Sequence, residues 1–316
     1  MAFGYDLNKA STVKLNNGQA IPIAGFGTYL IPAEKAATLV YDALAAGYRH
    51  IDTAIAYKNQ HQVAQGVANF LTDHPHIKRQ DIWFTTKIAN QNQGYENTHE
   101  AVKQISKDVK DLIEYVDLVL IHSPKTSTEK RLETYKALQE YVVDPNNTTL
   151  GIKSIGISNY GVSHLEELFK WDGLRVNPVI NQLELHPWLP RIELRKYLDQ
   201  HDIIAEAYSP LTQGYKLDDP ELVALSEKYK LSPAEILLKW SYLQGFVVLV
   251  KTENPKRIKE NLNFLPDPDD RTGADKEGNK TGPLHLDSEI LKALDKPDSK
   301  VVLTWGGVDP TLYTDE

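Results

Sequence analysis

The chain contains no cysteine among its 316 residues, which excludes disulfide bonds and thiolate metal sites. It also lacks an excess of positive charge, because 35 Lys and Arg stand against 43 Asp and Glu, for a formal net charge of −8. We therefore expect no nucleic-acid partner, since phosphate backbones bind to basic surfaces. No hydrophobic run approaches membrane-spanning length, and the first residues, MAFGYDLNKA, do not resemble a signal peptide. These absences predict a cytosolic protein with no membrane partner, and no motif predicts a metal site.

The usual fingerprint of a dinucleotide-binding fold is also missing. No G-x-G-x-x-G follows a strand, and GFGTYL at Gly25 to Leu30 has the wrong spacing and no helix directly after it. A dinucleotide must therefore bind without a Rossmann unit, if it binds at all.

What the sequence does contain is an alternation of strand-like and helix-like segments. With 41% hydrophobic and 25% charged residues, the composition is that of an ordinary globular protein. A hairpin over 12–21 precedes the alternation. Helical spacing of apolar residues separates the strands, and Ser232-Pro233-Ala234-Glu235 is typical of a helix start. The eight predicted strands are 23–28, 50–54, 82–88, 117–123, 154–159, 179–184, 203–210 and 246–251.

Eight such units predict a (β/α)8 barrel, which they fit better than a doubly wound sheet. We expect one domain over residues 1–316. Residues 265–286, rich in Asp, Gly, Pro and Lys, interrupt the pattern and predict a loop insertion. A short helix at 287–294 and a tail through Trp305 follow it.

Polar residues stand at the carboxyl end of every predicted strand, where barrel enzymes carry their catalytic groups. A simpler interpretation is that any barrel mouth is polar because it meets water. That interpretation does not explain why an acid, a lysine and a histidine gather near a tyrosine. The strand-end residues are Thr28, Asp52, Lys87, His122, Ser158, Asn159, Gln182, Tyr208, Ser209, Lys251 and Thr252, with Tyr57 shortly after the second strand.

Asp52, Tyr57, Lys87 and His122 together predict a proton-donating site. A free tyrosine has a pKa of about 10, and we expect the Lys87 cation to lower the pKa of Tyr57 toward working pH. An alternative is that Lys87 forms a Schiff base, as in aldolase-like barrels. Taken singly, Tyr57 or His122 would more often be structural.

Five segments stand in order along the chain: GYRHIDTAIAY (47–57), LVLIHSP (118–124), IGISNY (155–160), NQLELHPW (181–188) and VKTENPKRIKEN (250–261). They resemble the signature blocks of the aldo-keto reductases, in particular the fungal NADPH-dependent aldehyde and ketone reductases. The resemblance runs through nearly the whole chain and implies carbonyl reduction. It implies that Tyr57 is the general acid, that Lys87 and Asp52 form an ion pair beside it, and that His122 orients the carbonyl.

The same resemblance implies how a nicotinamide cofactor binds. Tyr208 would stack on the nicotinamide, with its carboxamide held by Ser158, Asn159 and Gln182. Lys251 and Arg257 bracket Thr252 near a helix opened by Pro255, which favours NADP(H) over NAD(H). Alone, this segment is also typical of a solvated, charged helix start. The remaining expected cofactor residues are Gly27, Thr28, Tyr29, Ser209, Leu211, Glu260 and Asn261.

The substrate pocket is expected to include Tyr29, Ala89, Ser123 and Trp305, while Trp83 belongs either to it or to the core. Many relatives carry tryptophans where this chain has Ala89 and Ser123. We therefore expect a wider and more polar pocket, suited to bulky ketones, keto esters or aldoses. The enzyme is expected to be a monomer. A second hypothesis is a cofactor-binding regulatory subunit or structural protein, since this fold also serves such roles.

Overall fold

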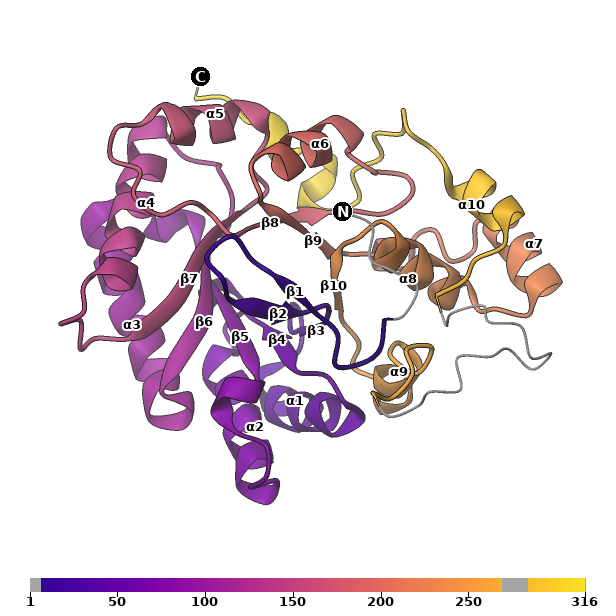
Figure 1. Cartoon of the computed structure of the whole chain (residues 1–316), viewed down its shortest axis with the longest axis horizontal. Helices are drawn as coiled ribbons and strands as arrows, with labels where there is room; N and C mark the ends of the chain where they lie inside the picture. Colours follow the sequence, from indigo (N-terminus) through magenta and orange to yellow (C-terminus); the bar gives the residue numbers. More distant parts are fainter. Residues whose placement is uncertain (1–6, 269–283, 316) are drawn as a thin grey trace.

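Eight parallel strands close into a barrel in the computed structural model, which describes residues 7–268 and 284–315. Neighbouring strands pair in chain order, and the last pairs with the first to complete the ring (Figure 1). This confirms the predicted (β/α)8 barrel. The strands are β3 (Ala24–Gly27), β4 (His50–Asp52), β5 (Trp83–Ile88), β6 (Tyr115–Ile121), β7 (Gly151–Ser158), β8 (Ile180–Glu184), β9 (Ile204–Tyr208) and β10 (Val247–Val250).

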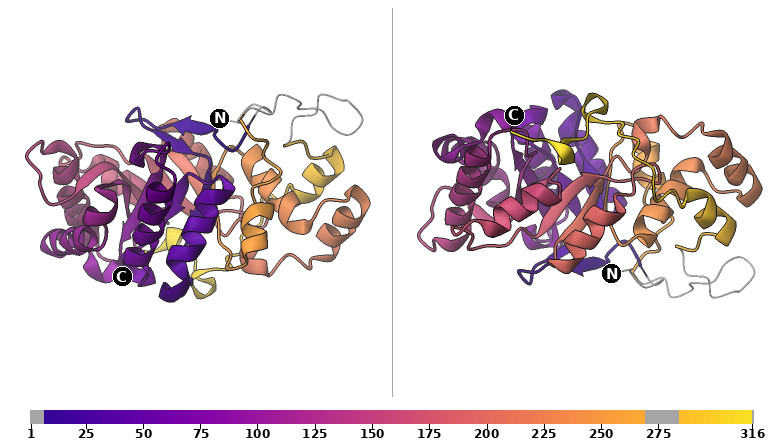
Figure 2. Two further views of the ribbon diagram at one scale, coloured as in Figure 1. Left: turned by 90° about the horizontal axis from the view of Figure 1, so that it is seen from below. Right: turned by 90° about the horizontal axis from the view of Figure 1, so that it is seen from above.

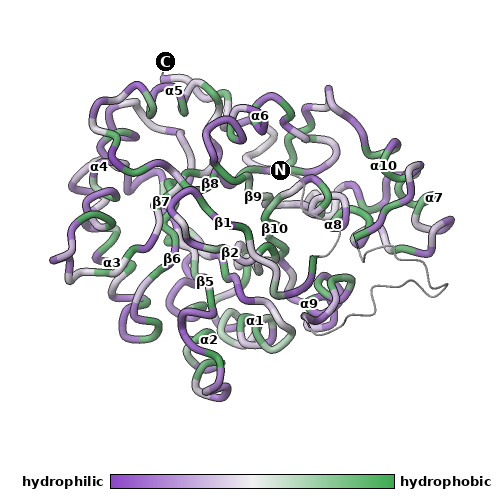
Figure 3. The backbone as a smooth tube through the Cα atoms, viewed as in Figure 1, coloured by the Kyte–Doolittle hydropathy of each residue, from purple (hydrophilic) through white to green (hydrophobic). Residues whose placement is uncertain are grey.

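Helices surround the barrel because the connections between successive parallel strands run across its outer face, and α9 and α10 follow the last strand. Figure 3 shows hydrophobic residues along central strands such as β10, whereas hydrophilic residues recur on the outer helices. The helices are α1 (Ala33–Ala46), α2 (Gln60–Asp73), α3 (Tyr95–Ile113), α4 (Thr128–Val143), α5 (Val162–Lys170), α6 (Ile192–Gln200), α7 (Pro220–Tyr229), α8 (Pro233–Leu243), α9 (Pro255–Glu260) and α10 (Ser288–Leu294). Single 3-10 turns are η1 (Ile55–Tyr57), η2 (Arg79–Asp81), η3 (Asn90–Asn92), η4 (Thr212–Gly214), η5 (Trp305–Gly307) and η6 (Pro310–Leu312).

The start of α8 shows how local sequence sets a helix boundary. Ser232 caps it by accepting a hydrogen bond from the Glu235 backbone N–H at 3.1 Å, and Pro233 occupies the first helical position. The predicted cap is confirmed, but the Glu235 carboxylate pairs with Lys239 at 2.9 Å, one turn along the helix.

The amino-terminal hairpin, β1 (Thr12–Lys14) and β2 (Ala20–Pro22), closes one end of the barrel. Its turn is tied down by Asn16, whose amide donates to the Pro178 carbonyl at 3.0 Å. Figure 2 shows this hairpin on the face opposite the carboxyl-terminal tail. We call the end of the barrel that the hairpin covers the closed end, and the opposite end the mouth. The hairpin contributes to a buried cluster of Leu15, Ile21, Trp83, Leu118, Leu120, Val179, Ile180 and Val247.

The predicted insertion at 265–286 lies largely outside the described residues, since only 265–268 and 284–286 belong to them. At its edges, Leu265 and Leu284 are buried in the main core. In the described part of the chain, no helix is both long and apolar enough to cross a membrane. Over the same residues, no group of three or more His, Cys, Asp or Glu side chains is arranged to hold a metal ion.

Candidate active site

A buried ion pair stands at the mouth, where β4 and β5 end. The Lys87 ammonium donates to Asp52 Oδ1 at 2.6 Å, to Asp52 Oδ2 at 2.7 Å and to the Thr53 carbonyl at 2.9 Å. Lys87 is 0% exposed and Asp52 3% exposed. A buried charge needs this degree of pairing, and the expected ion pair is present.

The same contacts weigh against the Schiff-base alternative. All three N–H donors of the Lys87 ammonium are engaged by acceptors. A nucleophilic lysine needs a free lone pair and access to substrate, and a fully buried lysine bonded to a carboxylate has neither.

Tyr57 is placed beside this pair by a short turn that follows β4. Asn59, which is fully buried, shapes that turn: its amide donates to the Thr28 and Ile31 carbonyls, both at 2.9 Å. Its carbonyl accepts from the Thr53 hydroxyl at 3.2 Å. Sequence reasoning missed Asn59, because its partners belong to the preceding strand-helix unit.

Three side chains surround the Tyr57 ring, which is only partly exposed. Lys87 Nζ lies 5.0 Å from the ring centroid, and the rings of Tyr29 and His122 are centred 5.1 Å and 5.6 Å away. Burial raises the pKa of Tyr57 well above its ordinary value, and the charge of Asp52 adds to the effect. The expected lowering of this pKa is therefore wrong, because burial and the negative charge of Asp52 outweigh the Lys87 cation. Tyr57 is a protonated phenol and a proton donor.

His122 follows β6, its backbone N–H held by the Ile88 carbonyl at 3.0 Å. Burial, together with the positive charge of Lys87, lowers the pKa of His122 to about 3. The imidazole is therefore neutral at pH 7 and carries one N–H donor. Asp52, Lys87 and His122 thus gather with Tyr57 at one place, as the three strand-end positions and the turn after β4 predicted.

A second carboxyl group lies behind the ion pair. Gln182 of β8 stands opposite Glu206 of β9 in the strand register. The Gln182 side-chain NH2 donates to Asp52 Oδ2 at 2.9 Å and to Glu206 Oε2 at 2.7 Å. Burial, then the charge of Asp52, raises the pKa of Glu206 to about 8. Sequence reasoning missed Glu206, although an acid within the apolar run IIAEAYSP was a usable signal.

The residues expected to hold a nicotinamide carboxamide are linked to one another. The Ser158 hydroxyl donates to the backbone carbonyl of Gln182 at 2.9 Å. The Asn159 amide donates to Ser158 Oγ at 2.9 Å and to the His122 carbonyl at 3.0 Å, while its oxygen accepts from the Tyr208 hydroxyl at 2.8 Å. The structure therefore brings Ser158, Asn159, Gln182 and Tyr208 into one network.

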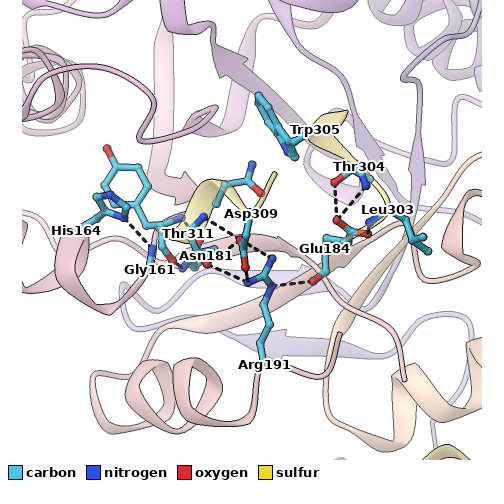
Figure 4. Close-up of polar contacts among 12 residues, drawn as sticks. Gly161, His164, Asn181, Glu184, Arg191, Leu303, Thr304, Trp305, Asp309 and Thr311 are labelled. Carbon is cyan, nitrogen blue, oxygen red and sulfur yellow. Dashed lines mark hydrogen bonds and ion pairs between the residues drawn. The ribbon is translucent and has the colours of Figure 1, made fainter. Parts of the chain in front are cut away.

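The carboxyl-terminal tail is fastened across the mouth (Figure 4). Buried Glu184 accepts from the Leu303 backbone at 2.8 Å and from the Thr304 hydroxyl at 2.5 Å. The next residue along the tail is Trp305. Its indole N–H donates to the Tyr208 hydroxyl at 3.0 Å, and its ring centroid lies 6.2 Å from that of His122. These contacts place Trp305 beside His122 and Tyr208.

The first strand-end residues lie at the same edge of the barrel. Gly27 pairs with Asp52 in the register, and Thr28 donates its hydroxyl to the Asp52 carbonyl at 2.9 Å. Tyr29 is 50% exposed beside Tyr57 and is open to ligands. After β9, Ser209 precedes the loop that contains Leu211. The backbone carbonyl of Ser209 accepts from the Thr212 backbone N–H at 2.8 Å.

Five of the expected cofactor residues lie around α9, namely Lys251, Thr252, Arg257, Glu260 and Asn261. Lys251 is paired with Glu253 at 3.0 Å, and Lys35 contacts the same carboxylate at 3.2 Å. Thr252 is buried and accepts from the Asn254 backbone at 3.1 Å. Arg257 is exposed, Glu260 pairs with Lys256 at 3.3 Å, and Asn261 is buried. Glu253, which sequence reasoning missed, is an anion within a segment expected to bind phosphate.

The expected pocket residues divide into two groups. Tyr29 and Trp305 flank the reacting cluster, whereas Ala89 and Ser123 are 2% and 0% exposed. The Ser123 hydroxyl donates to Asn90 at 2.8 Å, and the wider, more polar pocket expected from these two residues stays a prediction. Trp83 belongs to the cluster at the closed end, so the core assignment is the correct one.

Comparison with known proteins supports the geometry. Residues 24–269 match the model of the Aldo/keto reductase family. An uncharacterized oxidoreductase of Saccharomyces cerevisiae is 37% identical over 94% of this chain and 97% of its own length. A glyoxal reductase of Bacillus subtilis is 37% identical over 80% of this chain and 87% of its own. The crystal structure of an aldo/keto reductase from Brucella melitensis, 38% identical, matches with a TM-score of 0.75 over 91% of this chain and 99% of that one.

Proposed function

This chain belongs to the aldo/keto reductase family, and on that basis we propose that it reduces aldehydes and ketones to alcohols with NADPH. The observation that carries the proposal is the buried Lys87–Asp52 pair beside the protonated phenol of Tyr57 and the neutral imidazole of His122. A relative named glyoxal reductase supports the reduction of a carbonyl group.

One side-chain oxygen supports the fit of a nicotinamide to this site. Gln182 Oε1 accepts no hydrogen bond from any described residue, although Gln182 is only 2% exposed and both of its N–H groups are used. A carboxamide NH2 is a donor of the kind that this oxygen lacks. Tyr208, bonded to Asn159 and Trp305, offers a fixed aromatic ring beside it.

When bound, the cofactor supplies a hydride from nicotinamide C4 to the carbonyl carbon. The carbonyl oxygen then gains negative charge, and Tyr57 donates its phenolic proton to it. The high pKa of Tyr57 does not prevent this transfer, because an alkoxide is more basic than a tyrosinate. His122 donates an N–H to the same oxygen, and the charge of Lys87 stabilises the tyrosinate that remains. One carbonyl, one hydride and one proton give one alcohol.

The preference for NADPH over NADH rests on Lys251 and Arg257. Their cations suit the ribose phosphate, whereas Glu253 lies against Lys251 and opposes it. We expect Glu253 to turn from Lys251 when phosphate binds. The ratio of kcat/KM for NADPH to that for NADH measures this, and Arg257→Ala should lower the ratio about tenfold or more.

For the substrate we propose bulky ketones, keto esters or aldoses, because Ala89 and Ser123 occupy little volume behind the mouth. Ser123→Trp should reduce turnover of a bulky keto ester more than turnover of a small aldehyde. Equal effects on both substrates would contradict the proposed pocket. We also propose a monomer, which light scattering of the purified protein would check.

The deciding experiment follows NADPH absorbance with a panel of aldehydes, α-keto esters and aldoses, beside Tyr57→Phe. Turnover that the variant loses while it still binds NADPH supports the proposal and identifies the acid. NADPH binding by the wild type with no turnover on any carbonyl would instead favour a regulatory, cofactor-binding subunit.

A further inference from the structure

Glu206 is a buried acid that the mechanism above does not use. It lies in the middle of β9, is 0% exposed and points into the barrel toward three other elements. It faces Asp52 and His50 of β4, Lys87 of β5 and Gln182 of β8. Burying a carboxyl group is costly, so a fold that needed only packing would place an apolar side chain there.

Through its hydrogen bond with Gln182, Glu206 determines which way the Gln182 side-chain amide points. An amide NH2 has two hydrogens, and here each has its own acceptor: Asp52 Oδ2 at 2.9 Å and Glu206 Oε2 at 2.7 Å. Rotating the amide by half a turn would place its carbonyl oxygen against both carboxyl groups. Two acceptors therefore fix the amide orientation, where Asp52 alone would leave one N–H without a partner.

The surroundings of Glu206 suit a neutral acid. Its second oxygen, Oε1, has no hydrogen bond in the described part of the chain and lies 3.6 Å from His50 Nε2. His50 Nδ1 lies 3.3 Å from the Pro22 carbonyl, so Nδ1 carries the ring hydrogen and Nε2 is an acceptor. A proton on Glu206 Oε1 therefore faces an acceptor. The raised pKa of Glu206, due first to burial, agrees with this protonation state.

We propose that Glu206 is a positioning residue for the cofactor: it holds the Gln182 amide with its NH2 inward, so that Gln182 Oε1 is presented to the NH2 of the nicotinamide carboxamide. This inference rests on the proposed function, because it concerns how the reductase recognises its cofactor. The group recognised is an amide donor, which an analogue with a methyl ketone in its place does not have.

The test compares the binding of NADP⁺ and of its 3-acetylpyridine analogue, followed by quenching of tryptophan fluorescence. The wild type should bind NADP⁺ about tenfold more tightly, the value of one hydrogen bond. Glu206→Met should reduce this preference to about threefold or less, because the Gln182 amide is then free to turn. Glu206→Gln should keep the preference, since it retains an acceptor for Gln182 and offers its own NH2 to His50.

Thr85→Val is the matched control. Thr85 is buried in the same interior cluster and contacts His50 and Trp83, but not Gln182, so the preference should stay at its wild-type value. If Glu206→Met does not fold, Glu206→Asp makes the same test, because it withdraws the carboxyl group by one methylene and should also lose the preference.

A folded Glu206→Met or Glu206→Asp protein with the wild-type preference would overturn the inference, as would a wild type that binds both cofactors equally. Loss of the preference in Glu206→Gln would overturn it as well. These outcomes differ from failure of the proposed function, in which the wild type oxidises NADPH with no carbonyl, whether or not it binds the cofactor.

Discussion

The two ends of the barrel are filled by opposite kinds of side chain. At the closed end, Leu15 and Ile21 of the hairpin meet Trp83 and the apolar residues of four strands. At the mouth, the same inward direction is occupied by Asp52, Lys87, Gln182 and Glu206, all 3% exposed or less. The strands are common to both ends, so the difference lies only in the residue types along them.

The residues at the closed end contribute mainly to stability, whereas those at the mouth are suited to chemistry. Burying apolar surface stabilises the closed end by about 25 cal/mol per Å². At the mouth, ionisable groups are buried at a cost that their mutual hydrogen bonds offset in part. Substitutions at the closed end should therefore change stability alone. Substitutions at the mouth should change turnover, and they can either raise or lower stability.

The largest effect is expected for Lys87→Met. It removes the positive charge beside Tyr57 and should lower kcat by about 10³-fold or more. It also leaves Asp52 buried without its partner, which should cost about 3–5 kcal/mol of unfolding free energy. Urea unfolding and NADPH consumption measure the two effects. The double variant Lys87→Met/Asp52→Leu should recover much of the stability and none of the turnover; recovered turnover would contradict the role of the pair.

The opposite behaviour is expected for Trp83→Ala at the closed end. Removing this buried ring should cost about 3–5 kcal/mol of unfolding free energy, with kcat within about twofold of the wild type wherever the protein is folded. Trp83→Phe, which keeps most of the apolar volume, serves as the control and should cost less. A large fall in kcat with Trp83→Ala would show that the two ends are not independent.

The sequence predicted the barrel, and the meeting of polar side chains at its mouth, for a physical reason. Parallel strands place their carboxyl ends at one edge, so Asp52, Lys87 and His122 were bound to meet once the strands were recognised. The strands can be recognised from the local pattern of apolar residues, without knowing any distance between side chains.

The contacts that sequence reasoning missed depend on pairing across the fold. Gln182 reaches Glu206 because their strands pair in that register, and Glu184 holds Thr304 although they are 120 positions apart. Neither distance can be derived from composition or spacing. The predicted direction of the Tyr57 pKa shift was also wrong, because burial and the charge of Asp52, which raise this pKa, depend on the folded structure.

A smaller effect, of opposite sign, is expected for Glu206→Gln. The pKa of Glu206 is raised from 4.5 to about 8, so folding favours the protonated form. Its contribution to stability is fully present below pH 4.5 and is lost as the pH rises through about 8. The variant should therefore match the wild type near pH 4.5 and exceed it increasingly up to pH 8, by on the order of a few kcal/mol. Thermal unfolding between pH 4.5 and 9 measures the difference. A difference that stays constant with pH would contradict a neutral buried acid.

The smallest effect is expected where the tail is tied to the mouth by charge. Arg191 binds Asp309 through two parallel hydrogen bonds, at 2.9 and 3.0 Å, near the tail segment that carries Trp305 (Figure 4). Asp309→Asn should cost about 1–2 kcal/mol of unfolding free energy, because a bidentate pair is stronger than an ordinary surface ion pair. The KM for the carbonyl substrate should rise more than kcat falls, since Trp305 flanks the pocket and donates no proton to the substrate. Arg191→Met and the double variant complete a cycle whose coupling energy should be about 1 kcal/mol and should shrink in high salt. A coupling of zero would mean that the other tail contacts, such as the hydrogen bonds of Glu184 to Leu303 and Thr304, hold the tail without this ion pair.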